Sequence, residues 1–298
     1  MWGLSDEHRI LLVMTLSRIR WGVLVALLLS NVFILYVVLQ PNTQPLRISI
    51  LDVGQGDSIL IQSPTGVNVL VDGGPDRSVV RELPKRMGPL DRAIDLMVET
   101  HPDKDHIAGL ADVLEMYEVK NFMSPGVPND TNVFARLVAD VEKEPGVSVY
   151  TALRGQRIHL GDGAYADVLY PDHDVSHLRA TNDASIVLHV VYGETSFMLT
   201  GDLPSTIEDV LVSSVSPESL KSDVLKAGHH GSKYSTDDVW LQAVAPNTVV
   251  ISAGKGNTYG HPSPEALARV QKFGARIVST IDSGTITFES DGKRVLEK

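Results

Sequence analysis

One long uncharged segment limits what the N-terminal part of the chain can fold into. Residues 21–39, from Trp21 to Leu39, carry no charged side chain and are rich in Leu and Val. As a helix, a segment of this length rises about 28 Å at ~1.5 Å per residue, close to the ~30 Å thickness of the hydrocarbon layer of a membrane. We therefore predict a transmembrane helix over residues 21–39.

The flanks of this segment favour a retained anchor over a buried core helix or a cleaved signal peptide. No small residues of the kind that precede a cleavage site follow it, since the segment ends Val38-Leu39-Gln40-Pro41. Positive charge is concentrated before the segment, at Arg9, Arg18 and Arg20, and only Arg47 follows it closely. The positive-inside rule then predicts a single-pass protein of the cell membrane, with residues 1–20 cytoplasmic and residues 45–298 outside the cytoplasm.

The overall composition averages two different parts. The 298 residues carry a net charge of −11. Residues 1–44 hold three Arg against Asp6 and Glu7, a net +1, which leaves −12 for residues 45–298. This acidic balance argues against a long basic groove for nucleic acid. The absence of cysteine excludes a disulfide framework, a Cys-rich zinc module and a thiol nucleophile, so any metal must bind His and carboxylates.

From residue 45 onward the pattern is that of an α/β domain. Short β-rich runs separated by Gly- and Pro-containing turns over Arg47–Val71 predict an antiparallel meander. Ile94–Thr100 is a predicted strand, and the spacing of apolar residues over Ile107–Tyr117 predicts a helix. The segment between them, His101–His106, is therefore expected to be a strand-to-helix loop.

Side chains of the type that bind metals gather in this loop. His101, Asp103, Asp105 and His106 lie within six residues. Alternate residues of an extended loop can turn to one side, and the adjacent His106 can reach a second position. The spacing therefore suits two metals better than one.

Further candidates follow later in the chain, at Asp202, His229, His230 and His261. His229 and His230 are adjacent and cannot both point the same way from a strand, so we expect one to be a ligand and the other to orient it. Asp202 could instead cap the next helix. Three acidic residues beside glycines could simply shape turns, namely Asp52, Asp57 and Asp72.

Seven short segments extend this pattern in a fixed order. They are Leu51-Asp-Val-Gly-Gln-Gly-Asp-Ser58, Leu70-Val-Asp-Gly-Gly74, Thr100-His-Pro-Asp-Lys-Asp-His106-Ile-Ala-Gly-Leu110, Thr181-Asn-Asp-Ala-Ser185, Leu199-Thr-Gly-Asp202, Val224-Leu-Lys-Ala-Gly-His-His-Gly-Ser232 and Tyr259-Gly-His-Pro262. Together they resemble the metallo-β-lactamase-fold domain of ComEC-type competence proteins, over about residues 45–298. The resemblance implies a four-layer αββα sandwich with its site at one edge between two halves, and metal-dependent hydrolysis.

The resemblance also implies roles for individual residues. Asp72 matches a supporting carboxylate, and the expected ligands are His101 and Asp103 for a first metal, Asp105 and His106 for a second, a bridging Asp202 and the His229–His230 pair. Two departures matter: Asp103 replaces the usual middle His, and Asn182 and Asp183 stand where a further His is usual. The expected cofactor is one or two divalent ions, Zn²⁺ or Mn²⁺, since oxygen ligands favour Mn²⁺ whereas the general affinity order favours Zn²⁺.

A bound metal lowers the pKa of its water, so we expect hydrolysis in which Asp105 and Asp202 orient the nucleophile. His261, or whichever of His229 and His230 is not a ligand, is the candidate acid for the leaving group. The predicted substrate-binding residues are Asn182, Lys226, Ser232 and Lys233, with Lys255 nearby. The lysines could meet a substrate phosphate or could be ordinary solvated surface residues. Asp52, Asp57 and Asp72 are predicted to give structural support.

These features predict a membrane-anchored metal-dependent hydrolase, with a phosphodiesterase or nuclease as the leading hypothesis, because the resembling domain is linked with degrading a DNA strand during uptake. A single anchor cannot form a channel, so DNA transport would need a separate membrane channel protein. Two alternatives stay open: hydrolysis of an envelope or small-molecule phosphodiester, and a non-catalytic binding module. A serine hydrolase is disfavoured because no Gly-x-Ser-x-Gly motif is present.

Overall fold

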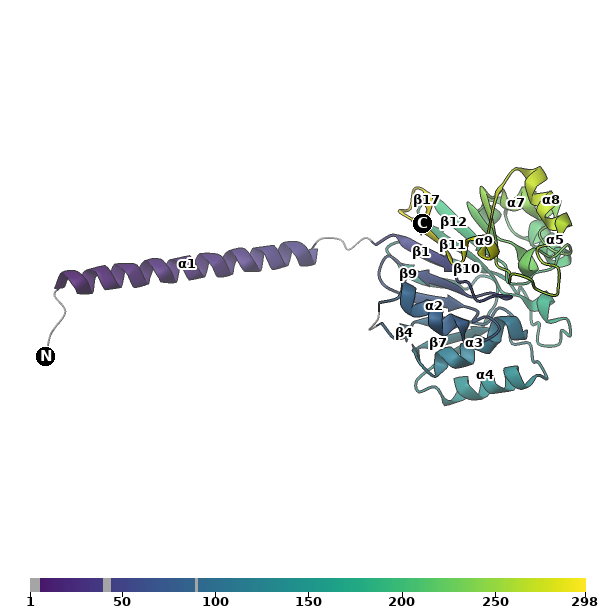
Figure 1. The fold of residues 1–298 in the computed structure, drawn as a ribbon, viewed down its shortest axis with the longest axis horizontal. Helices are drawn as coiled ribbons and strands as arrows, with labels where there is room; N and C mark the ends of the chain where they lie inside the picture. The colour runs from purple at the N-terminus through teal and green to yellow at the C-terminus, as the bar shows by residue number, and fades with distance from the viewer. Residues whose placement is uncertain (1–5, 40–43, 89–90) are drawn as a thin grey trace. The chain divides into compact units, whose positions relative to one another are not determined.

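The N-terminal unit of the protein is one long helix. The computed structural model describes residues 6–39, 44–88 and 91–298, and the chain divides into one unit up to Thr43 and another from Gln44 to Lys298. Helix α1 spans Asp6–Leu39 (Figure 1). Its window Arg18–Tyr36 has a mean hydropathy of 1.9 and is long and apolar enough to cross a membrane. The helix begins well before the predicted start at Trp21, because the preceding residues are mostly Leu, Ile, Met and Arg, which favour helix.

The second unit is built on two mixed β-sheets. The first has the strand order β17-β16-β1-β2-β3-β5-β7-β8 and the second β15-β14-β13-β12-β11-β10-β9. The first sheet contains β1 (Leu46–Ile50), β2 (Ile59–Gln62), β3 (Asn68–Val71), β5 (Leu96–Val98), β7 (Asn121–Ser124), β8 (Ser148–Thr151), β16 (Ile286–Ser290) and β17 (Val295–Glu297). The second contains β9 (Arg157–Gly161), β10 (Ala164–Tyr170), β11 (Val187–Tyr192), β12 (Thr195–Leu199), β13 (Val224–Lys226), β14 (Thr248–Ile251) and β15 (Arg276–Ser279). The short strands β4 (Ala93–Ile94) and β6 (Glu118–Val119) pair separately.

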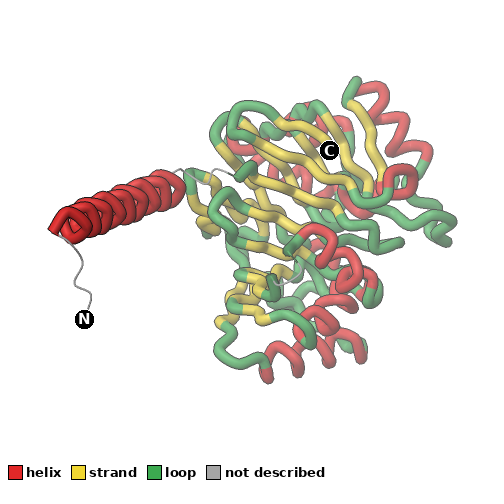
Figure 2. The backbone as a smooth tube through the Cα atoms, turned by 60° about the vertical axis from the view of Figure 1, so that its left-hand side comes forward, coloured by secondary structure: helices red, strands yellow, loops and turns green. Residues whose placement is uncertain are grey.

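Helices cover the outer face of each sheet (Figure 2). The first sheet is covered by α2 (Ser78–Arg86), α3 (Lys104–Leu114) and α4 (Asn132–Lys143). The second is covered by α5 (Ser205–Ser214), α7 (Asp238–Val244) and α8 (Pro264–Phe273). The short helices are α6 (Pro217–Leu220), α9 (Thr280–Ser283), η1 (Thr181–Ala184) and η2 (Gly228–Gly231). The predicted four-layer αββα sandwich is confirmed.

The largest core lies between the two sheets. In β1, Ile48 stands opposite Ile61 of β2 on one side and Phe288 of β16 on the other, and all three are buried. Phe288 also meets Phe197 of the second sheet, with ring centroids 6.2 Å apart. Full burial of each such side chain stabilises the fold by about 1.5–3 kcal/mol. The pairing of β1 with β16 ties the beginning of this unit to its end.

Both sheets contain parallel strands, and several of the predicted site residues lie in the loops that follow these strands. In the first sheet β3, β5 and β7 run parallel, and in the second β12, β13, β14 and β15 do so. The loops after β3 and β5 carry Asp72 and His101, and those after β12 and β13 carry Asp202 and His230. Loops at the carboxyl ends of parallel strands are the usual place for a ligand site in α/β proteins.

Two local predictions need correction. The segment His101–His106 is only partly a loop, because α3 begins at Lys104 and places Asp105 and His106 in its first turn. Asp103, with an extended backbone, is the N-cap residue that precedes the helix. Helix α2 has no counterpart in the sequence prediction, since its polar composition and the internal Pro84 hide the buried stripe of Val79, Val80 and Leu83.

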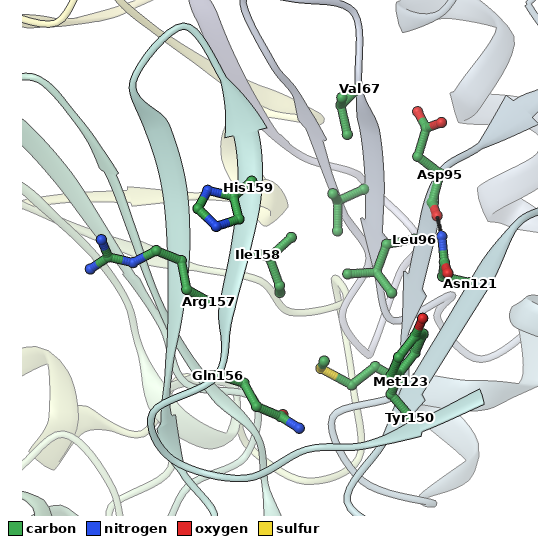
Figure 3. Close-up of a pocket in the computed structure, with 11 residues that line it drawn as sticks. Val67, Asp95, Leu96, Asn121, Met123, Tyr150, Gln156, Arg157, Ile158 and His159 are labelled. Atoms are coloured by element: carbon green, nitrogen blue, oxygen red, sulfur yellow. Dashed lines mark hydrogen bonds between the residues drawn. The ribbon is translucent and has the colours of Figure 1, made fainter. Parts of the chain in front are cut away.

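An apolar cavity of about 570 Å³ opens between the sheets at the edge formed by β8 and β9 (Figure 3). Its walls include Leu96, Met123 and Ile158. Its charged lining residues have partners, since Arg157 bonds Asp167 at 2.6 Å and Asp95 bonds Lys120 at 2.8 Å. None of the predicted site residues lines this cavity.

Candidate metal centre

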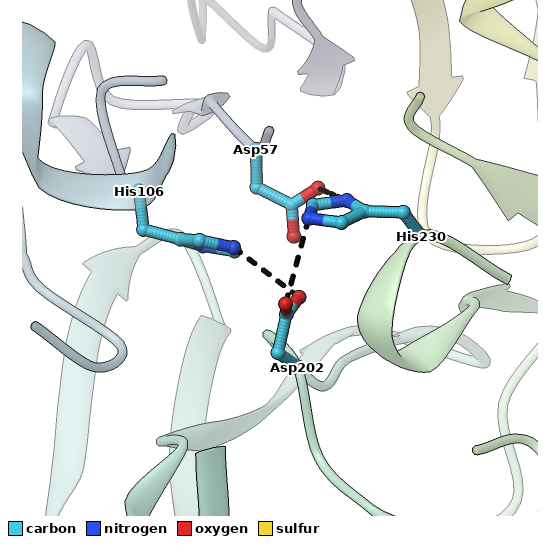
Figure 4. A group of neighbouring side chains, drawn as sticks. All are labelled: Asp57, His106, Asp202 and His230. Atoms are coloured by element: carbon cyan, nitrogen blue, oxygen red, sulfur yellow. Dashed lines mark ion pairs between the residues drawn. The ribbon is translucent and has the colours of Figure 1, made fainter. Parts of the chain in front are cut away.

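Four acidic and imidazole side chains meet in the interior of the second unit. Asp57, His106, Asp202 and His230 each offer one ligand atom, and these atoms all lie within 4.8 Å of one another (Figure 4). All four side chains are buried. We call this set the buried Asp/His group.

Four separate segments build the buried Asp/His group. Asp57 precedes β2, His106 lies in the first turn of α3, Asp202 follows β12, and His230 lies in η2. The approach of the first two segments depends on Gly56: a Cβ placed there would lie 2.1 Å from the carbonyl oxygen of Asp105. The backbone N–H of Asp57 donates to that same carbonyl at 3.3 Å. The glycine therefore allows the loop before β2 to pack against α3.

Outer hydrogen bonds fix how the imidazoles of this group face its centre. His106 Nδ1 donates to Asp72 Oδ2 at 2.7 Å, and His230 Nδ1 donates to the carbonyl of Ser252 at 2.9 Å. With its Nδ1 proton directed to Asp72 or to Ser252, each ring presents Nε2 to the centre of the group, 3.2 Å and 3.5 Å from Asp202 oxygens. His230 Nδ1 also lies 3.3 Å from Asp57 Oδ1. This is the arrangement of metal-binding histidines, whose other ring nitrogen is bonded to a carboxylate or carbonyl.

His101 is held in the same way through an intermediate. Thr100 Oγ1 donates its proton to Asp72 Oδ2 at 2.7 Å, so it must accept at its 3.0 Å contact with His101 Nδ1. His101 Nε2 is thereby left without a proton. The His101 ring is fully buried and its centroid lies 4.1 Å from that of His106. Asp72, the predicted supporting carboxylate, is thus hydrogen-bonded to His106 directly and linked to His101 through Thr100.

Several polar atoms of this region form no hydrogen bond of good geometry, although some of them face one another at ion-pair distances. They are Nε2 of His101, His106 and His230, Oδ1 of Asp57 and Oδ1 of Asp202, and each is buried. Buried polar atoms are almost always satisfied in native proteins. A divalent cation would satisfy these atoms together, and the His and carboxylate donors suit Zn²⁺ or Mn²⁺. The residues present therefore fit a metal.

The charges of the group are strongly coupled. Burial alone lowers the pKa of His230, but Asp202 and Asp57 raise it to about 9. Burial likewise opposes the charged form of His106, and Asp202 and Asp72 raise its pKa well above the usual value. For Asp202, burial raises the pKa, while His230 and His106 hold it well below the usual value. When no metal ion is bound, the nearby carboxylates favour the protonated form of His106 and His230.

The prediction that Lys226 binds substrate is wrong. A contact with a substrate phosphate would require Lys226 to lie at the surface, and it is buried. Its side chain is 1% exposed and forms an ion pair with Asp57. Its Nζ also donates to the carbonyl of Gly201 at 2.9 Å and lies 3.8 Å from Asp202 Oδ1. Lys226 is therefore an internal cation that offsets the carboxylates of the buried Asp/His group, and burial keeps it away from a substrate.

His229 and His230 differ in environment although they are adjacent. They lie in η2, not on a strand, with left-handed φ values of 46° and 55°. This backbone brings both rings to Asp202, with His229 Nε2 3.7 Å from Oδ2. Asn182 Nδ2 lies 3.3 Å from His229 Nδ1, so its amide can donate to that nitrogen and leave the ring proton on Nε2. Burial and His230 lower the pKa of His229, while Asp202 raises it, and the net shift is downward.

The remaining candidates lie around this centre. Asp105 Oδ2 is 3.4 Å from His230 Nε2, and Asp103 accepts a bond from Thr181 Oγ1 at 2.6 Å. The ring of His261 lies 5.3 Å from that of His229, and burial and His229 lower its pKa. Ser232 is buried and accepts from the N–H of Tyr234. Three candidates are exposed, Asp52, Lys233 and Lys255.

Asp57 was predicted as a support or turn residue, and the structure places it in the buried Asp/His group. Its sequence context held a signal. Two glycines precede it within Gly54-Gln-Gly56, and an apolar strand follows, which together indicate a loop that closely approaches another segment before entering the core. Its partner, Lys226, ends an apolar strand, but no local pattern indicates that this lysine is buried.

Fold and site define a metal-centred enzyme built on the metallo-β-lactamase sandwich. A family profile described as the metallo-beta-lactamase superfamily matches residues 51–255. The chain belongs to the metallo-beta-lactamase superfamily, and the prediction of a metal-dependent hydrolase of this superfamily is confirmed.

The chain is also similar to curated competence proteins. It is 32% identical to ComE operon protein 3 of Bacillus subtilis, over 81% of this chain and 33% of that protein. It is 29% identical to Recombination protein 2 of Haemophilus influenzae, over 80% of this chain and 28% of that protein. The chain thus spans about a third of the length of the curated relatives it matches, and the expected family resemblance is confirmed.

Solved structures share the fold at low identity. Igni18, a metallo hydrolase from Ignicoccus hospitalis, superposes with a TM-score of 0.51 at 16% identity, over 82% of this chain and 99% of that one. A mutant of CmlA β-hydroxylase gives a TM-score of 0.51 at 15% identity, over 83% of this chain and 54% of that one. These likenesses establish the sandwich only.

Proposed function

We propose that the chain is a membrane-anchored, metal-dependent phosphodiesterase that cleaves DNA. The observation that carries the proposal is the buried Asp/His group, whose inward-facing atoms form no hydrogen bond of good geometry, at the loop edge of a metallo-β-lactamase sandwich. The similarity to competence proteins supports DNA as the substrate, since these relatives imply a role in DNA uptake. A separate membrane channel protein would deliver the strand. The apolar helix α1 is consistent with a membrane location.

In this proposal Asp57, His106, Asp202 and His230 hold one cation, Mn²⁺ or Zn²⁺. His101 and Asp103, with Asp202 as the shared carboxylate, would hold a second. When bound, a divalent cation polarises a phosphate oxygen and lowers the pKa of a coordinated water. His229 is then not a ligand, because its Nδ1 faces the Asn182 amide.

The protein groups around the centre can position the reactants. In the metal-free protein, burial raises the pKa of Asp105, but its bond with His230 and the charge of His106 lower it, and the net shift is downward. A bound cation would supply positive charge in place of these imidazoles. Asp105 is therefore ionised at neutral pH and can accept a hydrogen bond from an attacking water. His229 and His261 have lowered pKa values and stay neutral at pH 7. Their N–H groups can donate to the leaving oxygen.

Exposed aromatic side chains beside the centre support a single-stranded substrate. Tyr259 is 68% exposed, and its ring stacks on His261 with an interplanar angle of 11°. Tyr234 is 66% exposed, and Lys233 Nζ lies 5.0 Å from its ring centroid. Unpaired bases stack on exposed aromatic rings, and lysines beside them attract the phosphates. A local surface of this kind offsets the acidic charge of the rest of the unit.

The test uses the full chain in lipid nanodiscs, stripped of metal and reloaded with Mn²⁺ or Zn²⁺. We expect cleavage of a labelled single-stranded oligonucleotide and of bis(p-nitrophenyl) phosphate. The double variant Asp105→Ala, His106→Ala should lose metal and both activities, and Asp238→Asn, at an exposed site, should retain them. Tyr259→Ala should raise KM for the oligonucleotide only.

The outcomes separate the alternatives. Cleavage of the small ester without the oligonucleotide would favour hydrolysis of an envelope or small phosphodiester. Cleavage of neither substrate, with metal shown by elemental analysis to be bound, would reject both the DNA and the small-phosphodiester hypotheses. It would favour a non-catalytic binding module.

A further inference from the structure

A second cavity lies on the outer side of the first sheet, beneath α4. It measures about 500 Å³, within the range of small-molecule sites. Most of its lining is apolar, from β7, β8, α4 and the loop after β7, and includes Phe122, Val127, Phe134, Val138, Val141 and Val149. None of the residues of the metal centre lines it.

The buried charged residue of this lining is Glu99, which directly follows β5. It is 2% exposed, and its Oε1 is buried without a hydrogen-bond partner. Within residues 44–88 and 91–298, no hydrogen bond or ion pair of its carboxyl group is found. A carboxyl group buried among apolar side chains is costly unless it is paired. Its position at a cavity wall means that a ligand can supply the partner.

The cavity is separate from the proposed catalytic site although the two share a segment. Thr100, the next residue, donates from its backbone N–H and hydroxyl to Asp72 and so belongs to the support of the metal centre. Glu99 instead donates its backbone N–H to the carbonyl of Met123 in β7 and lines the cavity beneath α4. Successive residues of an extended chain face opposite sides, which accounts for this division.

We propose that this cavity binds a small organic cation, a primary ammonium on an apolar body, with Glu99 as the counter-ion. A second carboxylate, Glu142, lines the cavity, and among the described residues no lysine, arginine or histidine does. The cavity therefore favours positive charge. A bare metal ion does not fit, because it needs about six oxygen ligands and the walls are mostly hydrocarbon. The apolar body would pack against Phe122, Phe134 and Val138.

The test is calorimetric binding of benzylamine, with benzyl alcohol as the neutral probe of the same size. The full chain is used in nanodiscs, and empty nanodiscs correct for partition into lipid. We expect the wild type to bind benzylamine at least tenfold more tightly than benzyl alcohol. Glu99→Gln should reduce that preference below about twofold, whereas the matched variant Glu115→Gln, at an exposed position after α3, should leave it unchanged.

A second variant tests the cavity without changing the carboxyl group. Val138 is 39% exposed on α4, so a larger side chain there can fill the cavity while the helix remains folded. Val138→Trp should weaken benzylamine binding at least tenfold. Equal binding of amine and alcohol by the wild type, or wild-type amine binding by either Glu99→Gln or Val138→Trp, would overturn the proposal. None of these readouts depends on phosphodiesterase activity.

Discussion

Asp72 shows how one carboxylate can arrange two imidazoles. Its Oδ1 accepts from the backbone N–H of Thr100 at 2.8 Å, and its Oδ2 accepts from Thr100 Oγ1 and from His106 Nδ1, both at 2.7 Å. The residue adopts a left-handed φ of 59° to do so. Its effect on His106 is direct, and its effect on His101 passes through the threonine hydroxyl.

Replacing this carboxylate should therefore weaken metal binding. In Asp72→Asn the amide nitrogen cannot accept a hydrogen bond, so His106 or Thr100 loses its acceptor. We expect metal affinity to fall about 10–100-fold, as for other groups that orient metal ligands. Competition with a chelating dye measures the affinity, with Asp52→Asn as the exposed control. Unchanged affinity in Asp72→Asn would contradict the supporting role.

Lys226 gives a second prediction, because its ammonium group offsets Asp57 and Asp202. Lys226→Met leaves two buried carboxylates with less compensating charge, and removal of one partner of a buried ion pair costs about 3–5 kcal/mol. We expect this loss of stability in the metal-free protein and a large recovery on adding Mn²⁺ or Zn²⁺. Chemical unfolding with and without metal measures both effects.

The control for this variant is Lys120→Met, which removes an exposed pair with Asp95. Exposed pairs contribute little to stability because solvent screens them, so this variant should unfold nearly as the wild type does. A Lys226→Met protein that is destabilised equally with and without metal would show that Lys226 acts on the fold and has no link to the metal centre.

Glu208 provides a pH-dependent prediction away from the metal centre. It accepts from the backbone N–H groups of Thr236 and Asp237, and burial raises its pKa to about 8. A carboxyl group whose pKa rises on folding favours the folded state below its unfolded pKa, near 4.5, and this contribution is lost as pH rises toward 8. We expect stability to fall over that range and the decline to be smaller in Glu208→Gln. Urea unfolding across pH 5–9 measures the difference, and parallel curves would reject the effect.

At the scale of elements, the loop before β2 and helix α3 depend on Gly56. In Gly56→Ala the new Cβ would overlap the carbonyl oxygen of Asp105, and φ is +139°. Gly66 also has a positive φ, +88°, but has open space around its Cβ position. Gly66→Ala should cost about 1–2 kcal/mol from backbone strain alone. Gly56→Ala should cost about 1–3 kcal/mol more from the overlap and should also weaken metal binding, because Asp57 is displaced.

Equal destabilisation of the two alanine variants, with metal binding intact in both, would contradict this account of Gly56. Unfolding curves and metal titrations on the same preparations distinguish the two contributions, since only one of these glycines contacts a segment of the metal centre.

The sequence was most informative where a motif follows a strand. The antiparallel meander of β1, β2 and β3 and the position of His101 after a strand were predicted from apolar runs and turns. Long-range charge pairing was not predicted. The ion pair of Lys226 with Asp57 joins β13 of the second sheet to the loop before β2 of the first. No local pattern shows that a lysine at a strand end will be buried against a distant carboxylate.

Local patterns also misjudged the backbone of the histidine pair. The prediction treated His229 and His230 as neighbouring residues of a strand. In the structure β13 ends at Lys226, and the two histidines adopt left-handed conformations. Such conformations are rare for residues other than glycine, and they persist only where surrounding contacts hold them. Here the contacts are with Asp202, Ser252 and Asn182, which come from other parts of the fold.

At the scale of the whole molecule, the prediction concerns topology. If α1 crosses the membrane with residues 1–20 in the cytoplasm, residues 45–298 lie outside the cytoplasm. Protease added to spheroplasts should then digest this unit, while a cytoplasmic marker protein stays intact. Replacing Arg9, Arg18 and Arg20 by Gln and adding arginines after residue 39 should reduce digestion. Full protection of the wild type in intact spheroplasts, with digestion after lysis, would reverse the proposed orientation.

The pairing of β1 with β16 has a consequence during synthesis. The partner of β1 is synthesised only when residues 286–290 are made, and His230 is made after Asp57, His106 and Asp202 of the buried Asp/His group. A growing polypeptide therefore has neither a closed first sheet nor a complete set of ligands. We expect the centre to bind metal only after residue 230 has been made, and the first sheet to close only after β16 has docked.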